Sequence, residues 1–144
     1  MGPLKWLLAL FALAVAAGCG QNGDLGAKVS DTACPAGVAQ VGIGDGYFQN
    51  ICGCDEPAGK LFLSPNTMTC TAPLGTRVVF QFLATRSLHQ VIAVGTPSFP
   101  ASPVSDPGLS DFPVRSHVIR PGTLGTYHFQ DVTNSALAGQ LVIR

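Results

Sequence analysis

Apolar and polar residues alternate with a period of two over several short stretches of this chain. In RVVFQFLAT (77–85), the side chains of Val78, Phe80 and Phe82 fall on one face of an extended segment. The stretch TYHFQD (126–131) alternates in the same way. This period is typical of half-buried β-strands, and no stretch beyond the N-terminal quarter sustains a helical period over three turns. The pattern predicts an all-β chain.

Two further stretches are predicted strands. LHQVIAV (88–94) places His89 and Val91 on one face, and QLVIR (140–144) is an apolar closing strand. Short strands separated by turn residues favour a two-sheet sandwich or a small barrel. The segment 95–113 differs, because it carries five prolines, which cannot occupy a central strand. We expect a long surface loop there, which either makes a functional contact or only links two strands.

The N-terminus has the features of an export signal. Lys5 precedes an unbroken apolar run from Leu7 to Ala17, which is too short to span a bilayer comfortably. Small residues then lead directly to Cys19, an arrangement that resembles the lipobox of bacterial lipoproteins and implies that Cys19 is lipidated. An ordinary secretory signal that discards Cys19 is the alternative. We expect a lipoprotein signal peptide over residues 1–18.

The remaining chain is expected to form a tether and one domain. Residues 19–33 are polar and rich in glycine, with too little apolar surface to offset the cost of ordering them. Residues 34–144 are enough for a single core. Removal of the signal leaves seven basic against eight acidic side chains, so the charge predicts no nucleic-acid partner.

Four cysteines remain in the mature chain: Cys34, Cys52, Cys54 and Cys70. An exported protein enters an oxidising compartment, so two disulfides are expected. The sequence leaves three connectivities open, although a bond between Cys52 and Cys54 would be strained. A zinc site made from the four thiolates is the competing interpretation, but the spacing lacks the two C-x2-C hooks that such sites usually show.

Several segments resemble the cupredoxins of the plastocyanin and amicyanin type. The resemblance covers residues 61–144 and is carried by FLSPNTMTCTAPLGTRVVFQF, SLHQVIAV, RPGTLGTYHFQD and GQLVIR. It implies a Greek-key β-sandwich after the signal peptide. It also implies a type 1 copper held by two histidines, a cysteine and usually a methionine, a soft ligand set that suits both copper oxidation states.

Most of the copper ligands that this resemblance implies are missing. The first histidine falls on His89, but the cysteine falls on Asp131, the second histidine on Asn134 and the methionine on Leu137. Without the thiolate a type 1 site cannot form. We therefore expect no cofactor, with copper as the alternative.

Two interpretations of the altered site remain open. In the first, Asp131 accepts a hydrogen bond from the His89 imidazole and Asn134 completes a polar plug. In the second, His89, Asp131 and water hold Cu(II) or Zn(II), aided by His117 or His128. His128 has the opposite parity to Asp131 on its strand, so it is expected to face away.

The sequence therefore predicts a lipid-anchored, extracytoplasmic cupredoxin-like module with a binding or structural role. Its partners would be the membrane, through the anchor, and an unidentified envelope protein, contacted through CGCDEPAG (52–59) or the proline-rich loop. Gly20 after the lipidated cysteine resembles lipoproteins sorted to the outer membrane. The alternative is a periplasmic copper protein, either an electron carrier or a copper holder. No nucleophile elbow or HExxH motif is present, so an enzyme is not expected.

Overall fold

The computed structural model describes residues 33–83, 86–108 and 115–144. The predicted signal peptide, Cys19 and all of the predicted tether except its last residue lie outside these ranges. The described residues form strands and loops, and no helix among them is long and apolar enough to cross a membrane. The strands are β1 (Val38–Gly44), β2 (Tyr47–Cys52), β3 (Leu61–Leu63), β4 (Met68–Ala72), β5 (Arg77–Phe82), β6 (Val91–Val94), β7 (Ser116–Ile119), β8 (Gly125–Asp131) and β9 (Ala138–Ile143).

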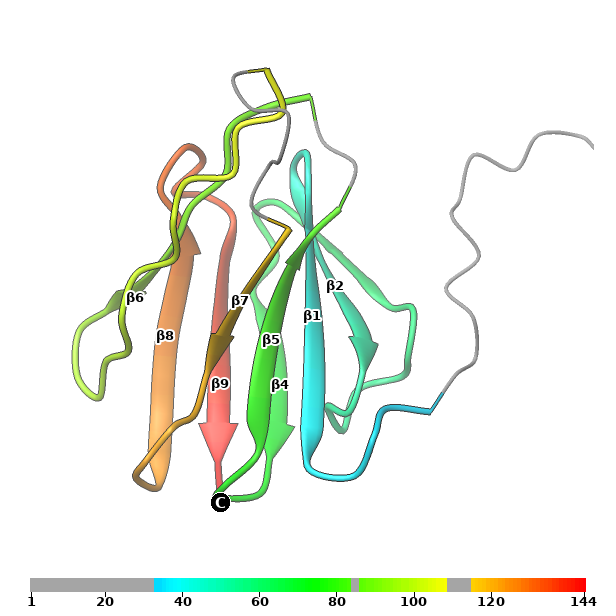
Figure 1. Ribbon diagram of the computed structural model, residues 1–144, viewed down its shortest axis with the longest axis vertical. Helices are drawn as coiled ribbons and strands as arrows, with labels where there is room; N and C mark the ends of the chain where they lie inside the picture. The colour runs from blue at the N-terminus through cyan, green and yellow to red at the C-terminus, as the bar shows by residue number, and fades with distance from the viewer. Residues whose placement is uncertain (1–32, 84–85, 109–114) are drawn as a thin grey trace, which may run out of the picture.

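The strands pack as two sheets, as the alternation pattern predicted (Figure 1). One sheet has the order β3-β2-β1-β5-β7, and the other has the order β4-β9-β8-β6. The pairs β1–β5 and β4–β9 are parallel, and the other neighbours are antiparallel. The chain changes sheet at every connection from β3 to β8, while β1, β2 and β3 follow one another in the first sheet and β8 and β9 in the second. The fold is an all-β Greek-key sandwich, as expected.

The core lies between the sheets and is built from the inward positions of the strands. Phe129 of β8 packs edge-on against Phe48 and Phe80 of the opposite sheet, with ring centroids 5.2 and 5.1 Å apart, a geometry that aromatic rings favour. Gly139 lies opposite Phe129 on β9. A Cβ atom at Gly139 would approach the Phe129 ring to 2.3 Å, so only glycine leaves room for the central ring.

The sandwich is larger than the resemblance to residues 61–144 indicated. β1 lies between β2 and β5 in the centre of its sheet, and its inward residues Val41 and Ile43 are fully buried. Two of the cysteines are therefore part of strands, Cys52 at the end of β2 and Cys70 in β4. The residues before position 61 supply two of the five strands of this sheet, β1 and β2.

Two disulfides are present, as expected. They join Cys34 to Cys52 and Cys54 to Cys70. Gly53 separates the two bonds and has a φ of +82°, and a Cβ atom there would lie 2.2 Å from the Val38 carbonyl oxygen. The turn at Gly53 lets Cys52 bond to Cys34, just before β1, while Cys54 bonds to Cys70 on the opposite sheet.

The proline-rich segment has no named strand within its described part, residues 95–108. The side chains of Pro100, Pro103 and Pro107 are exposed, as expected for a surface loop. Between these prolines the segment still pairs with the edge of the second sheet, because the Ser102 amide donates to the Val91 carbonyl at 2.9 Å. Residues 109–114 of the predicted loop lie outside the described residues.

Candidate functional site

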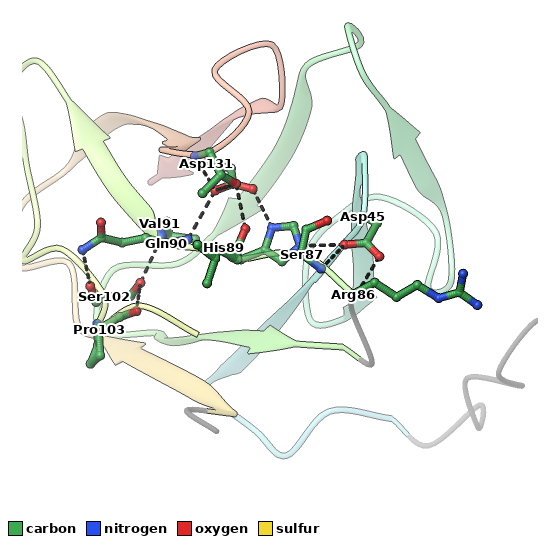
Figure 2. Close-up of polar contacts among 11 residues, drawn as sticks. Asp45, Arg86, Ser87, His89, Gln90, Val91, Ser102, Pro103 and Asp131 are labelled. Carbon is green, nitrogen blue, oxygen red and sulfur yellow. Dashed lines mark hydrogen bonds and ion pairs between the residues drawn. The ribbon is translucent and has the colours of Figure 1, made fainter. Parts of the chain in front are cut away.

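Two of the residues that the resemblance placed at the copper position, His89 and Asp131, meet at one end of the sandwich. Asp131 is the last residue of β8 and pairs with Val91, the first residue of β6. His89 precedes β6 by two positions, so it faces the same side as Val91 and lies beside the end of β8. Figure 2 shows the imidazole pointing toward the Asp131 carboxylate.

His89 and Asp131 form a buried hydrogen-bonded pair. The His89 Nδ1 atom lies 2.6 Å from Asp131 Oδ2, and the two residues are 2% and 0% exposed. Asp131 Oδ1 accepts from the amide of Gln90 at 3.3 Å, and from the amide and hydroxyl of Thr133, both at 3.1 Å. The hydrogen bond expected between His89 and Asp131 is present.

A third residue, Asp45, completes the arrangement from the other sheet. Its Oδ1 atom lies 3.0 Å from His89 Nε2, and its carboxylate accepts from the amides of Arg86 at 2.9 Å and Ser87 at 3.3 Å (Figure 2). Asp45 belongs to the Asp-Gly turn between β1 and β2. Sequence reasoning missed this residue, although an Asp-Gly pair between two alternating runs is a hairpin signal. Asp45, His89 and Asp131 are called the clamp below.

The geometry of the clamp requires a protonated imidazole. An ionised carboxylate can only accept hydrogen bonds, so a carboxylate at each ring nitrogen calls for an N–H on both. The hydrogen bond from Asp131 is the main cause that raises the pKa of His89 above its usual value, against the effect of burial. Below this raised pKa, His89 is an imidazolium held between two carboxylates that lie on opposite sides of its ring.

Both aspartates stay ionised in this arrangement. Burial opposes the ionisation of Asp131, but its hydrogen bonds to His89 and to the amides of Thr133 and Gln90 outweigh burial and hold the pKa of its carboxyl below the usual value. The pKa of Asp45 is also lowered, mainly by the amide of Arg86. With His89 protonated, the clamp carries a negative charge on each aspartate and a positive charge on the imidazole between them.

The free energy of unfolding should fall as the pH rises through the raised pKa of His89. The stabilisation from a histidine with a raised folded pKa is fully present below its unfolded pKa of about 6.5 and is lost above the folded value. The aspartates act in the opposite direction, because their lowered pKa values stabilise the fold above about 3.9 and lose that effect in stronger acid. Stability should therefore be greatest in mildly acidic solution.

Urea unfolding of the wild type, of His89→Gln and of His128→Gln at a series of pH values checks this expectation. The decline toward alkaline pH should disappear in His89→Gln and persist in His128→Gln, because His128 is exposed. An identical decline in all three proteins would show that the clamp does not titrate as expected.

The other predicted site residues have different partners from the His89 imidazole in the part of the chain that the structure describes. Asn134 is half-buried, and its backbone carbonyl accepts from the Leu137 amide at 2.8 Å, while Thr133 makes the contacts with Asp131. Leu137, at the methionine position, is fully buried in the core. His117 lies on β7 of the other sheet, where its Nε2 atom is 2.9 Å from the Pro100 carbonyl oxygen. His128 is exposed on β8, as its parity predicted.

The residues at this end do not fit a type 1 copper. The four remaining cysteines are all in disulfides, so none offers a thiolate. Both nitrogens of His89 are hydrogen-bonded, and the two carboxylates lie on opposite sides of the ring rather than converging with it on one point. Within residues 33–83, 86–108 and 115–144, no group of three or more His, Cys, Asp or Glu side chains is placed to hold a metal ion. The clamp instead cross-links the two sheets through the contacts of His89 with Asp45 and Asp131.

Comparisons with known proteins locate this fold among the cupredoxins. No protein-family model matches the sequence, and no curated protein sequence matches it. Among solved structures, a purple cupredoxin from Nitrosopumilus maritimus aligns over 74% of this chain and 99% of its own, with a TM-score of 0.50 and 18% identity. An oxidised methionine-to-lysine variant of amicyanin aligns over 77% of this chain and 86% of its own, with a TM-score of 0.51 and 13% identity. The chain contains a cupredoxin-like domain.

Proposed function

We propose that this chain is a lipid-anchored, extracytoplasmic cupredoxin-like module that has a binding or structural role and carries no type 1 copper. The clamp is the observation that carries the proposal. In a copper site the histidine would offer a lone pair to the metal, but here each ring nitrogen of His89 lies within hydrogen-bond distance of a carboxylate oxygen. Asp131 stands where the resemblance places the cysteine ligand, and its carboxylate binds His89 in an internal cross-link.

The position of the clamp explains what this cross-link does for a binding module. Asp45 belongs to the turn of the five-stranded sheet, whereas Asp131 ends a strand of the four-stranded sheet. His89 joins them at one end of the sandwich, where loops emerge. Loops held on a rigid scaffold are the usual carriers of contacts in sandwich folds. A fixed loop end of this kind suits the recognition of an envelope protein.

The same geometry argues against hydrolytic catalysis at this end. A histidine that serves as a general base needs a nitrogen free to accept a proton. Both nitrogens of His89 are engaged by carboxylates, so neither faces a serine hydroxyl. A non-catalytic role is therefore part of the proposal.

One feature of the sequence and one of the structure support export and anchoring. The lipobox-like segment ending at Cys19 supplies an attachment point, and multiple acylation there would give firm membrane binding. The two disulfides suit an oxidising compartment. Membrane fractionation of cells that express the wild type or Cys19→Ala tests this part, and the wild type alone should stay with the membranes.

Metal analysis of the full chain tests the main proposal. Protein purified from its native compartment, incubated with one equivalent of Cu(II) and desalted, should retain no stoichiometric metal and show no intense visible absorption. His89→Ala and His128→Ala should behave like the wild type. A strong blue or purple band would overturn the proposal. Colourless protein with one metal ion that is lost in His89→Ala but kept in His128→Ala would instead support a copper holder.

A further inference from the structure

The end of the sandwich opposite the clamp carries a distinct surface, which we call the base. It consists of residues 73–77, 120–125 and 143–144. Several contacts bring these segments together: the Leu74 amide donates to the Arg144 carbonyl at 3.1 Å, Gly125 pairs with Ile143, and Val78 pairs with Ile119 one position inside the base. Figure 1 shows these loops at the bottom of the molecule, around the C-terminus.

Two arginines lie side by side on the outer face of the base. Val78 of β5 and Ile119 of β7 are paired and point inward, and Arg77 and Arg120 are their exposed neighbours in the chain on the side of the base. Both are exposed, and neither has an ion pair among the described residues. Two like charges held close together at a protein surface repel each other. An anion bound between them would relieve this repulsion.

Exposed apolar side chains flank the arginines on the two loops of the base. Leu74 is 50% exposed and Leu124 is 63% exposed. They lie on either side of the end of β9, because Leu74 contacts Arg144 and Leu124 precedes the residue paired with Ile143. Asp55 also reaches this end, but it is engaged in an ion pair with Arg144. The base therefore combines protruding leucines with two uncompensated positive charges.

The predicted anchor enters the domain at the same end. The described chain begins at residue 33, and Gly37 next to β1 accepts the Arg77 amide at 2.9 Å. Cys19 is only about 14 residues upstream, and a flexible chain of that length has an end-to-end distance of roughly 20 Å. A lipid at Cys19 would thus hold the base close to the bilayer surface.

We propose that the base docks on an anionic lipid surface, with Arg77 and Arg120 contacting phosphate groups and with Leu74 and Leu124 entering the interface. This inference rests on the proposed lipid anchoring. Basic residues at an anionic membrane surface contribute about 1 kcal/mol each. Docking of the base turns the clamp and its loops away from the membrane, which exposes them to a protein partner.

Hydrogen–deuterium exchange of the acylated full chain on vesicles tests this orientation. The vesicles are phosphatidylcholine alone, or phosphatidylcholine mixed with phosphatidylglycerol. Amides of residues 73–77 and 120–125 should exchange several-fold more slowly on the anionic vesicles, and high salt should remove the difference. Amides of the loops around the clamp should exchange equally on both.

Substitutions make the test specific to the two arginines. Each of Arg77→Gln and Arg120→Gln should reduce the ratio of docked to undocked molecules about five-fold, since 1.4 kcal/mol corresponds to ten-fold. Arg115→Gln is the matched control, because Arg115 is exposed at the other end of the same sheet, where its carbonyl accepts the Phe82 amide. Thermal unfolding confirms that each variant is folded.

The outcomes separate this inference from the anchoring on which it rests. Protein that floats with both kinds of vesicle but shows the same exchange on each overturns the docking of the base. Slower exchange around the clamp instead of the base also overturns it. Protein that floats only with anionic vesicles, and loses this ability in Arg77→Gln, lacks the anchor but keeps the docking surface.

Discussion

Asp131→Ala is expected to lower the free energy of unfolding by about 3–5 kcal/mol, the cost typical of removing one partner from a buried ion pair. Asp131 is fully buried and accepts from His89, Gln90 and Thr133. Its loss leaves a buried imidazolium with one carboxylate, and it leaves the amides of Gln90 and Thr133 without this acceptor. Urea unfolding at mildly acidic pH, where His89 is protonated, measures the effect.

Two variants serve as controls for this prediction. Asp45→Ala should cost less, because the Asp45 side chain is 41% exposed and water can replace it at the imidazole. His128→Ala changes an exposed residue on the same strand as Asp131, so its effect should lie within about 0.5 kcal/mol. If Asp131→Ala were as mild as His128→Ala, the clamp would not hold this end of the sandwich together.

Removal of the bond between Cys54 and Cys70 is expected to lower the free energy of unfolding by about 2–5 kcal/mol. The bond closes a segment of 16 residues, for which loop entropy alone gives about 3 kcal/mol. Cys70 is fully buried in β4, whereas Cys54 follows β2 of the opposite sheet. The bond therefore ties the two layers together through the core.

The Cys54→Ala/Cys70→Ala protein is best compared with Cys34→Ala/Cys52→Ala. The second bond joins the segment before β1 to β2, and these strands already pair, with Gln40 opposite Cys52. Removal of this second bond should lower the free energy of unfolding by an amount at the lower end of the same range. Equal or reversed losses in urea unfolding would contradict the layer-bridging role. Peptide mapping without reduction should recover both bonds in the wild type.

Much of the fold was predictable because β-structure leaves a short-range pattern in the sequence. The alternation of Tyr127, Phe129 and Asp131 against His128 placed the first three inside and the last outside, as the structure shows. The same parity argument placed His89 with Val91 and so toward Asp131. These predictions need only the two-residue period of a strand.

The partners within the site were less predictable. Asp45 precedes His89 by 44 residues, and it reaches the imidazole because β1 lies beside β5 in parallel. Nothing in the local sequence indicates that pairing. The choice of Thr133 over Asn134 as the neighbour of Asp131 depends on how the loop turns after β8.

The sequence by itself determined the fold class, the inward faces of the strands and the missing thiolate at position 131, because each depends on residue type and local spacing. Only the tertiary structure decided the disulfide connectivity, the third member of the clamp and the approach of the segments that carry Arg77 and Arg120 at the base. These features depend on contacts between segments far apart in the chain. Such contacts form where the burial of apolar side chains brings the two sheets together, and no short stretch of sequence records which polar groups will then face each other.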